Sequence, residues 1–253
     1  MLVVGMRHWV IKNKVEVIMR HKFVVIEGPD GSGKTTQCTL LQSELHRRGY
    51  FSWFCHLPRL EIGVAGGMIA DFLRGEYGSL DCVHPKLVSL LFALDRKDLL
   101  PELSKKLQFE STWVLMDRYI YSNIAFQAAK IANHREKQHF VEWLIDLEFG
   151  QFELPVPDVY IYLDVPLSFL EKVLKLRVKS ESRGYLKRVV DIHEVDFDFQ
   201  KRVMAEYKNI KSYTRENGGS PVQFEIIQCY DAVGNMKPID VIHNMIVSVI
   251  FGD

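Results

Sequence analysis

A run of residue types that can hold phosphate lies near the start of the chain. From Gly28 to Thr35 it reads GPDGSGKT, which fits the pattern GxxxxGK[ST] at every fixed position. Glycines let backbone N–H groups point at phosphate oxygens, Lys34 adds a mobile positive charge, and the Thr35 hydroxyl can ligate Mg²⁺. The run therefore predicts nucleoside triphosphate binding, a property that GTPases, motor ATPases and small-molecule kinases share. The expected triphosphate contacts are Gly28, Gly31, Ser32, Gly33, Lys34, Thr35 and Thr36.

A second set of polar residues follows an apolar run further along the chain. Asp117 and Arg118 come directly after Val114–Met116, a run typical of a buried strand. Parallel sheets bind ligands at their carboxyl edge, where an acid can hold hydrated Mg²⁺ and an arginine can hold a phosphate with two hydrogen bonds. Asn123 and Gln127 follow, four residues apart on a predicted helix, and can present amides to a base.

Two further clusters have both a functional and a structural interpretation. Phe92 and Arg96 are four apart on a predicted helix, so one can stack on a flat base while the other hydrogen-bonds its carbonyl edge. A core phenylalanine beside a surface arginine is the alternative. Lys175–Arg188 contains six basic residues and one acid, Glu181. Beside a phosphate loop this stretch is expected to close over the transferring group, the alternative being a solvated charged stretch.

Apolar runs and helical periodicity alternate along the chain. The predicted strands are Lys22–Glu27, Tyr50–Cys55, Trp113–Met116, Val159–Leu163 and Gln223–Gln228. The predicted helices are Gly33–Arg48, Ile62–Leu73, Pro85–Leu107, a helix from about Ser122, Glu136–Phe149, Pro166–Arg177, His193–Tyr213 and Pro238–Ile250. This alternation predicts one α/β domain in three layers, a five-stranded parallel sheet flanked by helices. With the phosphate loop after its first strand, the expected architecture is a P-loop NTPase fold with a lid segment.

The bulk composition excludes several classes of protein. The 253 residues are 47% hydrophobic and carry zero net formal charge, with 32 basic and 32 acidic residues. This balance gives no reason to expect nucleic acid or an anionic membrane as a partner. The four cysteines form no CxxC pair, so we expect reduced thiols in a cytoplasmic protein.

The first 20 residues stand apart from the predicted domain, which covers 21–253. They contain several basic residues and a single acid, Glu16. They lack the serine richness and the clear apolar block of targeting signals, so we expect an extension outside the core, with Met19 as an alternative start. A targeting segment is the other interpretation.

The stretches that carry the predicted chemistry also form a recognisable pattern. Five segments occur in the order seen in thymidylate kinases, which phosphorylate dTMP to dTDP with ATP: EGPDGSGKTTQ, LLFALDRKD, DRYIYSNIAFQAAK, PDVYIYLDVP and DIHEVDFDFQKRVMAEY. They span most of Phe23 to Tyr207, and the chain resembles this family, most closely its bacterial members. The resemblance implies ATP as donor, dTMP as acceptor and Mg²⁺ as cofactor. It also implies a homodimer packed through helices near Leu87–Leu99 and the segment after Tyr119.

The resemblance implies which residues contact dTMP. They are Asp30, Arg59, Phe92, Arg96, Arg118, Asn123, Phe126 and Gln127. Phe92 would stack on thymine, Arg96 would reach its O4 atom, and Asn123 would read the base edge. Phe126, where many members have tyrosine, would crowd the 2′ position and disfavour ribonucleotides. Arg59 would ligate phosphate from a segment, HLPRLEIG, whose wording departs from the family pattern.

The same resemblance implies that a small set of charged residues carries out catalysis. They are Asp30, Lys34, Asp117, Arg118 and Arg183. Thr35 and Asp117 would hold the metal, and Asp30 would hold the sugar 3′-hydroxyl or act near Mg²⁺. Arg177 would stack on adenine. His193 stands where the family more often has tyrosine.

The catalytic arginine is expected from the lid segment, about 178–191. Some family members carry an arginine inside the phosphate loop, where this chain has Gly31. Arg183 is therefore the first choice, ahead of Lys187 and Arg188.

Two rival functions remain compatible with the motifs. A deoxynucleoside kinase also has a phosphate loop and an acid–arginine pair, but it needs a carboxylate base to deprotonate a neutral 5′-hydroxyl. A non-catalytic nucleotide-binding protein would bind nucleotide without turnover. Comparing dTMP with thymidine as the acceptor distinguishes a thymidylate kinase from both of these rival functions.

Overall fold

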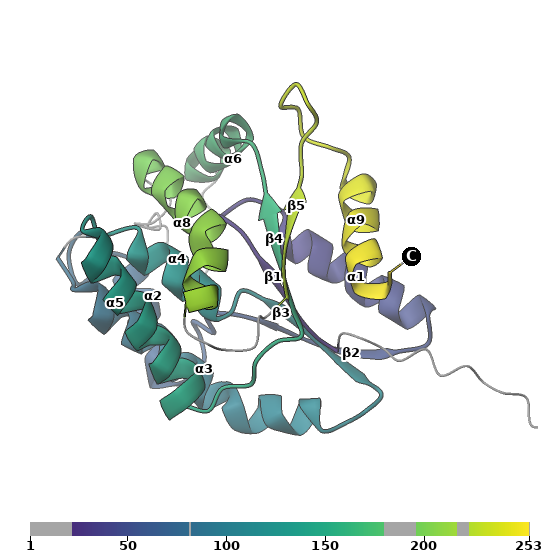
Figure 1. Ribbon diagram of the computed structural model, residues 1–253, viewed down its shortest axis with the longest axis horizontal. Helices are drawn as coiled ribbons and strands as arrows, with labels where there is room; N and C mark the ends of the chain where they lie inside the picture. Colours follow the sequence, from purple (N-terminus) through teal and green to yellow (C-terminus); the bar gives the residue numbers. More distant parts are fainter. Residues whose placement is uncertain (1–21, 81, 180–195, 217–222, 253) are drawn as a thin grey trace, which may run out of the picture.

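The computed structural model describes residues 22–80, 82–179, 196–216 and 223–252. The extension predicted for 1–20, most of the lid segment and the start of the helix predicted from His193 lie outside the described residues. Within them, strands and helices alternate in the predicted order (Figure 1).

Five parallel strands form the central sheet, as predicted. They are β1 (Phe23–Glu27), β2 (Phe51–His56), β3 (Thr112–Asp117), β4 (Val159–Asp164) and β5 (Gln223–Gln228). Their order in the sheet is β2-β3-β1-β4-β5. Because helices cover both faces, β1, β3 and β4 are continuous apolar runs rather than alternating ones. The carboxyl ends of β1 and β3 lie side by side, with Ile26 in register with Asp117.

Helices cover the two faces of the sheet. They are α1 (Lys34–Arg47), α2 (Gly63–Leu73), α3 (Pro85–Leu107), α4 (Ile120–Ala128), α5 (His134–Ile145), η1 (Asp146–Gln151), α6 (Leu167–Lys179), α8 (Phe197–Glu216) and α9 (Ile239–Phe251). One face carries α1 and α9, and the other carries α3, α4, α5 and α8 (Figure 1). Helix α2 packs against α3. The three layers of the predicted α/β fold are thus confirmed.

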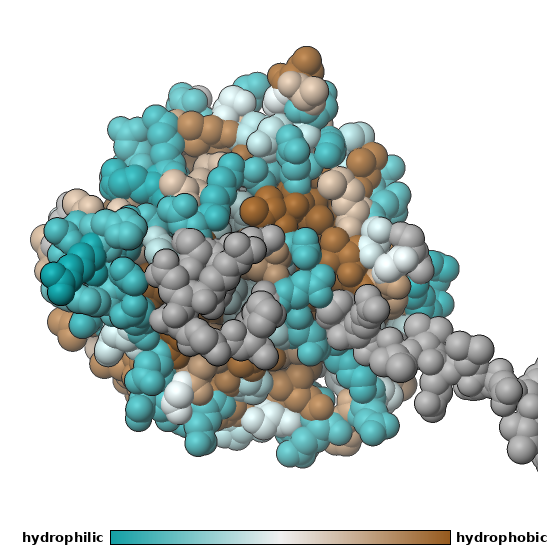
Figure 2. Space-filling view, in the orientation of Figure 1, coloured by the Kyte–Doolittle hydropathy of each residue, from teal (hydrophilic) through white to brown (hydrophobic). Residues whose placement is uncertain are grey.

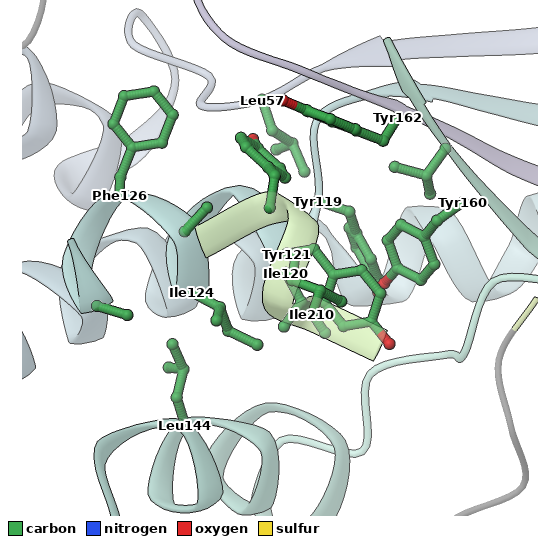
Figure 3. Close-up of a cluster of buried hydrophobic side chains, with 14 of the residues drawn as sticks. Leu57, Tyr119, Ile120, Tyr121, Ile124, Phe126, Leu144, Tyr160, Tyr162 and Ile210 are labelled. Carbon is green, nitrogen blue, oxygen red and sulfur yellow. The ribbon is translucent and has the colours of Figure 1, made fainter. Parts of the chain in front are cut away.

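Buried tyrosines fill much of the core on the α4 and α8 face. Tyr121 stacks on Tyr160 with ring centroids 4.0 Å apart, and Tyr162 stacks on Tyr207 at 4.8 Å. Figure 3 shows Tyr121 and Tyr160 close together, with Phe126 apart from them and further along α4. Packing against the aromatic core therefore fixes the position of α4, whose other side chains can contribute to a cavity.

The helical stretch predicted for Glu136–Phe149 is helical throughout but consists of two segments of different helix type. Helix α5 begins earlier, because the Asn133 side chain accepts a hydrogen bond from the Glu136 backbone N–H and caps the helix. From Asp146 the chain continues as the π-helix η1. A hydrophobic pattern at helical spacing does not separate α-helix from a short π-helix, which occurs frequently at functional sites.

The surface mixes polar and apolar side chains. On the face shown in Figure 2, hydrophilic residues are interspersed with hydrophobic ones. In the part of the chain that the structure describes, no helix combines the length and the apolar character that crossing a membrane requires. All four cysteines are free thiols, and Cys38 and Cys229 are buried.

Candidate active site

A cavity of about 320 Å³ lies at the carboxyl edge of the sheet. The loops that follow β1, β2 and β3 form its wall together with side chains of α3 and α4. Parallel sheets bind ligands at this edge, and the volume suits a small molecule. Among the predicted site residues the cavity brings together Asp30, Gly31, Gly33, Lys34, Thr35, Thr36, Phe92, Arg96, Asp117, Arg118, Asn123, Phe126 and Gln127.

The phosphate loop has the backbone conformation that its glycines predict. Gly28, Gly31 and Gly33 have positive φ angles, and Gly33 precedes α1 in the left-handed region. A Cβ atom at Gly28 would lie 2.6 Å from Ser32 Oγ, so the position accepts no side chain without a shift. Gly28 and Ser32 fall outside the described residues that line the cavity, and their contact with ATP remains a prediction.

Lys34 is a buried cation that lines the cavity. Its Nζ donates a hydrogen bond of 2.9 Å to the Pro29 carbonyl oxygen. Burial, and then the nearby charge of Arg118, lower the pKa of Lys34 to about 8, although the carboxylates of the site act in the opposite direction. A desolvated cation beside a second cation is stabilised by an incoming anion, so this part of the cavity favours phosphate.

Asp117 ends β3 beside the phosphate loop. Its Oδ2 accepts a hydrogen bond of 2.6 Å from Thr35 Oγ1 and lies 3.2 Å from His56 Nδ1. Burial opposes ionisation, but the hydrogen bond from His56 and the charge of Lys34 hold the pKa of Asp117 at about 2. Its Oδ1 is buried and has no hydrogen-bond partner among the described residues. An ionised carboxylate with an open oxygen beside a hydroxyl provides the hard oxygen ligands that Mg²⁺ takes.

Arg118 is held rigidly in the cavity. Its φ of 73° is rare for a residue other than glycine, and such backbone strain occurs at functional sites. Its Nη2 donates to Asp30 Oδ1 at 2.8 Å, and its Nη1 donates to Ser122 Oγ at 2.9 Å and Tyr207 Oη at 3.3 Å. Burial acts against the charged form, but Asp30 and other neighbouring acidic groups raise the pKa of Arg118. The guanidinium is therefore charged and fixed in direction.

A buried carboxylate, Glu27, lies behind Arg118. Its Oε1 accepts hydrogen bonds from the backbone N–H groups of Tyr119 and Ser122, and its Oε2 accepts from Ser122 Oγ at 2.5 Å and Tyr207 Oη at 3.0 Å. Burial raises the pKa of Glu27 despite these bonds. Sequence reasoning missed this network of Glu27, Ser122 and Tyr207, although all three fall within segments that carry the resemblance.

The α3 and α4 side of the cavity combines an aromatic ring, a cation and two amides. Phe92 is half-buried there, whereas Arg96, Asn123 and Gln127 are buried. The alternative of a surface arginine was wrong: Arg96 is 3% exposed, and its guanidinium forms two hydrogen bonds with Glu148. Sequence reasoning missed Glu148, and no motif marked it.

Arg59 is a predicted site residue whose guanidinium is bound to two acids of α3. It falls outside the described residues that line the cavity. Its Nε bonds to Asp95 Oδ1 at 2.9 Å and its Nη2 to Asp98 Oδ2 at 2.8 Å. These two acids fix the segment after β2 onto α3, so the geometry gives no support to phosphate ligation by Arg59.

The predicted lid residues fall largely in a part of the chain that the structure does not describe. Arg183, Lys187, Arg188 and His193 lie outside the described residues. For Arg177 only the helical backbone of α6 is described.

The fold and the site together define a class. A parallel α/β sheet carries a phosphate loop after its first strand, with a lysine, a hydroxyl and a carboxylate converging on one cavity. These are the features of a nucleotide-binding protein with the P-loop NTPase fold. A family model described as thymidylate kinase matches residues 26–217, and the chain belongs to this family.

Known relatives agree with that assignment. The chain is similar to a probable thymidylate kinase of Thermococcus kodakarensis, with 28% identity over 90% of this chain and 96% of the relative. It is 31% identical to a probable thymidylate kinase of Methanococcus vannielii, over 75% of this chain and 78% of the relative. A solved thymidylate kinase structure from Candida albicans covers 91% of each chain with a TM-score of 0.65 and 24% identity, which shows the shared fold.

Proposed function

We propose that this protein transfers the γ-phosphoryl group of ATP to dTMP, forming ADP and dTDP. Membership of the thymidylate kinase family supports the reaction. The observation that carries it here is a single cavity in which a phosphate loop and Arg118 meet Phe92, Arg96 and Asn123. The part near the phosphate loop and Arg118 suits the reacting phosphate groups. The part near Phe92, Arg96 and Asn123 suits a flat base with hydrogen-bonding edges.

The reaction needs positioning and charge stabilisation more than proton transfer. An oxygen of the dTMP phosphate attacks the γ-phosphorus, the bond to the β,γ-bridging oxygen breaks, and ADP leaves with the electron pair. The acceptor oxygen is already anionic, so no strong general base is required. Lys34, Arg118 and the loop N–H groups would hold the reacting phosphates in line and stabilise the charge spread over the equatorial oxygens.

Thr35 and Asp117 would hold the Mg²⁺ ion that the family implies. The unpartnered, buried Oδ1 of Asp117 and the adjacent Thr35 hydroxyl fit such an ion. When bound, the ion would supply positive charge that offsets the negative charge of the reacting phosphates.

The remaining roles rest on the resemblance. Arg183 is proposed as the catalytic arginine, supplied by a lid at about 178–191 that closes over the phosphates and excludes water. Arg177 is proposed to stack on adenine. We propose one folded domain over 21–253, with 1–20 outside it, and a cytoplasmic location in keeping with four free thiols.

A homodimer is proposed through α3, which holds the predicted Leu87–Leu99 stretch, together with the neighbouring helix α2. The segment after Tyr119, also expected at the interface, forms α4, and all of its residues are buried within the chain. Val64 and Met68 are exposed one turn apart on α2, and Leu87 and Leu94 are exposed on one side of α3. The two helices pack against each other. Exposed apolar groups gathered on neighbouring helices are typical of an interface between proteins.

A coupled assay of ADP release tests the function. With ATP and Mg²⁺ present, dTMP, dUMP, CMP, AMP and thymidine are compared as acceptors. We expect the fastest release with dTMP. Turnover with thymidine but not dTMP would assign the protein to the nucleoside kinases. ATP binding without turnover of any acceptor would leave a nucleotide-binding protein.

A further inference from the structure

Glu148 is a fully buried carboxylate in the π-helix η1, and it contacts the cavity wall without lining the cavity. Arg96 donates to it twice, from Nε to Oε2 at 2.5 Å and from Nη2 to Oε1 at 2.6 Å. Asn123 Nδ2 also donates to Oε1, at 3.0 Å. One carboxylate therefore binds two side chains that come from different helices, α3 and α4, and that both line the cavity.

The two bonds to Arg96 fix the direction of its guanidinium. The group is planar, so holding Nε and Nη2 also fixes Nη1. Nη1 forms no hydrogen bond within the described part of the chain, while Arg96 lines the cavity. Burial acts against the charged form, but the carboxylate of Glu148 raises the pKa of Arg96. Arg96 thus offers the cavity a permanent hydrogen-bond donor.

The bond to Asn123 fixes which end of its amide faces a ligand. Nδ2 donates to the Ser89 carbonyl oxygen as well as to Glu148, each at 3.0 Å. Both partners only accept, so a rotated amide would place oxygen against oxygen. Asn123 Oδ1 is buried and has no hydrogen-bond partner among the residues described. Because a buried acceptor without a partner is unfavourable, this oxygen favours a ligand that donates to it.

The resulting pattern is one donor, from Arg96, beside one acceptor, from Asn123. A pyrimidine with a 4-keto group presents the matching acceptor and N3–H donor, whereas cytosine presents the reverse. Resting on the proposed function, we propose that Glu148 is a positioning residue that selects 4-keto over 4-amino pyrimidine monophosphates by orienting Arg96 and Asn123. Glu148 lies in the π-helix η1 rather than in a regular α-helix. Segments of π-helix occur frequently at functional sites.

Glu148→Gln tests this role. The new amide nitrogen cannot accept a hydrogen bond, so either Arg96 loses one of its two bonds or the Asn123 amide loses its orientation. We expect about a 10- to 100-fold loss of dTMP affinity, as a rise in KM with little change in kcat, from the loss of one buried interaction. The preference for dTMP over dCMP, measured as a ratio of Kd values by calorimetry, is expected to fall about 10-fold or more. The affinity for 2-deoxyribose 5-phosphate, which has no base, is expected to stay unchanged.

Two further variants separate positioning from general packing. Glu206→Gln is the matched control, because Glu206 is another buried carboxylate, which bonds to Lys137 and Tyr213 but does not line the cavity. It should leave the dTMP to dCMP ratio unchanged. Glu148→Asp keeps the charge, and it tests the positioning role if Glu148→Gln does not fold. Its shorter side chain cannot keep all three bonds, so the ratio should fall in the same direction.

The proposal is overturned if the dTMP to dCMP ratio is unchanged in the folded Glu148 variant, or if affinity for 2-deoxyribose 5-phosphate falls as much as affinity for dTMP. Failure of the proposed function is a separate outcome, because it would appear in the wild-type protein as absence of dTMP phosphorylation.

Discussion

Single buried residues carry the charges that would bind phosphate. Lys34 and Arg118 both line the cavity and lie close enough for each charge to affect the other. Nearby carboxylates partly offset this repulsion, and a phosphate group would offset it further. The arrangement of these charges thus lowers the stability of the empty protein and raises its affinity for anions, as is common at strained functional sites.

The variant Lys34→Met should separate the effect of this charge on phosphate transfer from its effect on the stability of the empty protein. We expect turnover to fall about 100- to 1000-fold at neutral pH, the loss seen when one charge-stabilising donor is removed, while the empty protein loses no stability. The folded-state pKa of about 8 lies below the ordinary 10.5, so between these pH values the unfolded chain binds more protons than the folded one. The free energy of unfolding of the wild type should therefore rise, relative to that of the variant, from pH 8 to 10.5.

Urea unfolding of both proteins at several pH values measures this difference. Lys105→Met, on the exposed side of α3, is the control and should show neither effect. A stability gap that is constant with pH would contradict the lowered pKa of Lys34.

At the scale of whole elements, two helices position parts of the site through residues that do not line the cavity. Helix α8 carries Tyr207 across to β1 and α4, where its hydroxyl bonds to Glu27, Ser122 and Arg118. Helix α2 holds the segment that follows β2, which forms part of the cavity wall. Changes at Tyr207 of α8 and Gly66 of α2, which do not line the cavity, should therefore affect dTMP binding indirectly.

Tyr207→Phe removes one hydroxyl from the buried network. Glu27 and Arg118 each lose a hydrogen bond, so we expect the free energy of unfolding to fall by about 1–3 kcal/mol and the KM for dTMP to rise. Tyr213→Phe is the matched control, because Tyr213 lies on the same helix and donates to Glu206, which does not line the cavity. If both variants change KM equally, the network does not position Arg118.

Gly66 and Gly67 are adjacent in α2 but have different surroundings. A Cβ atom at Gly66 would overlap the Arg59 carbonyl oxygen, whereas one at Gly67 would meet nothing within 4 Å. Gly66→Ala should therefore lower the free energy of unfolding by about 1–3 kcal/mol and weaken dTMP binding. Gly67→Ala should raise it by about 0.5–1 kcal/mol, because alanine is the better helix former. Urea unfolding and dTMP titration measure both effects, and similar behaviour of the two variants would contradict the close approach at Gly66.

At the scale of the whole molecule, the apolar residues exposed on α2 and α3 are the part of the surface proposed to meet a second copy. The double variant Leu87→Glu/Leu94→Glu should place charges in that interface and give a monomer of about the 29.4 kDa chain mass. Light scattering after size-exclusion chromatography measures the mass. Val233→Glu is the control, since Val233 is equally apolar and 81% exposed in the turn after β5. A dimeric double variant would exclude this face, and a monomeric wild type would exclude the dimer.

The sequence by itself determined the local parts of this protein. The period of apolar residues fixed which segments are strands and helices, with ends within a few residues of those found. The glycines, Lys34 and Thr35 specified the phosphate loop, because the backbone angles it needs depend on neighbouring residues. Most of the predicted site residues also meet in one cavity, since parallel strands bring their carboxyl ends to one edge.

Only the tertiary structure decided which partner each buried charge has. Arg96 meets Glu148 from 52 positions away, and Glu27 meets Tyr207 across 180 positions. Arg59 lies between two cavity-lining residues, Pro58 and Leu60, yet its guanidinium is bound to Asp95 and Asp98 of α3. A buried charge must find a partner, but the choice among many acids depends on how the layers pack, and spacing along the chain does not encode that choice.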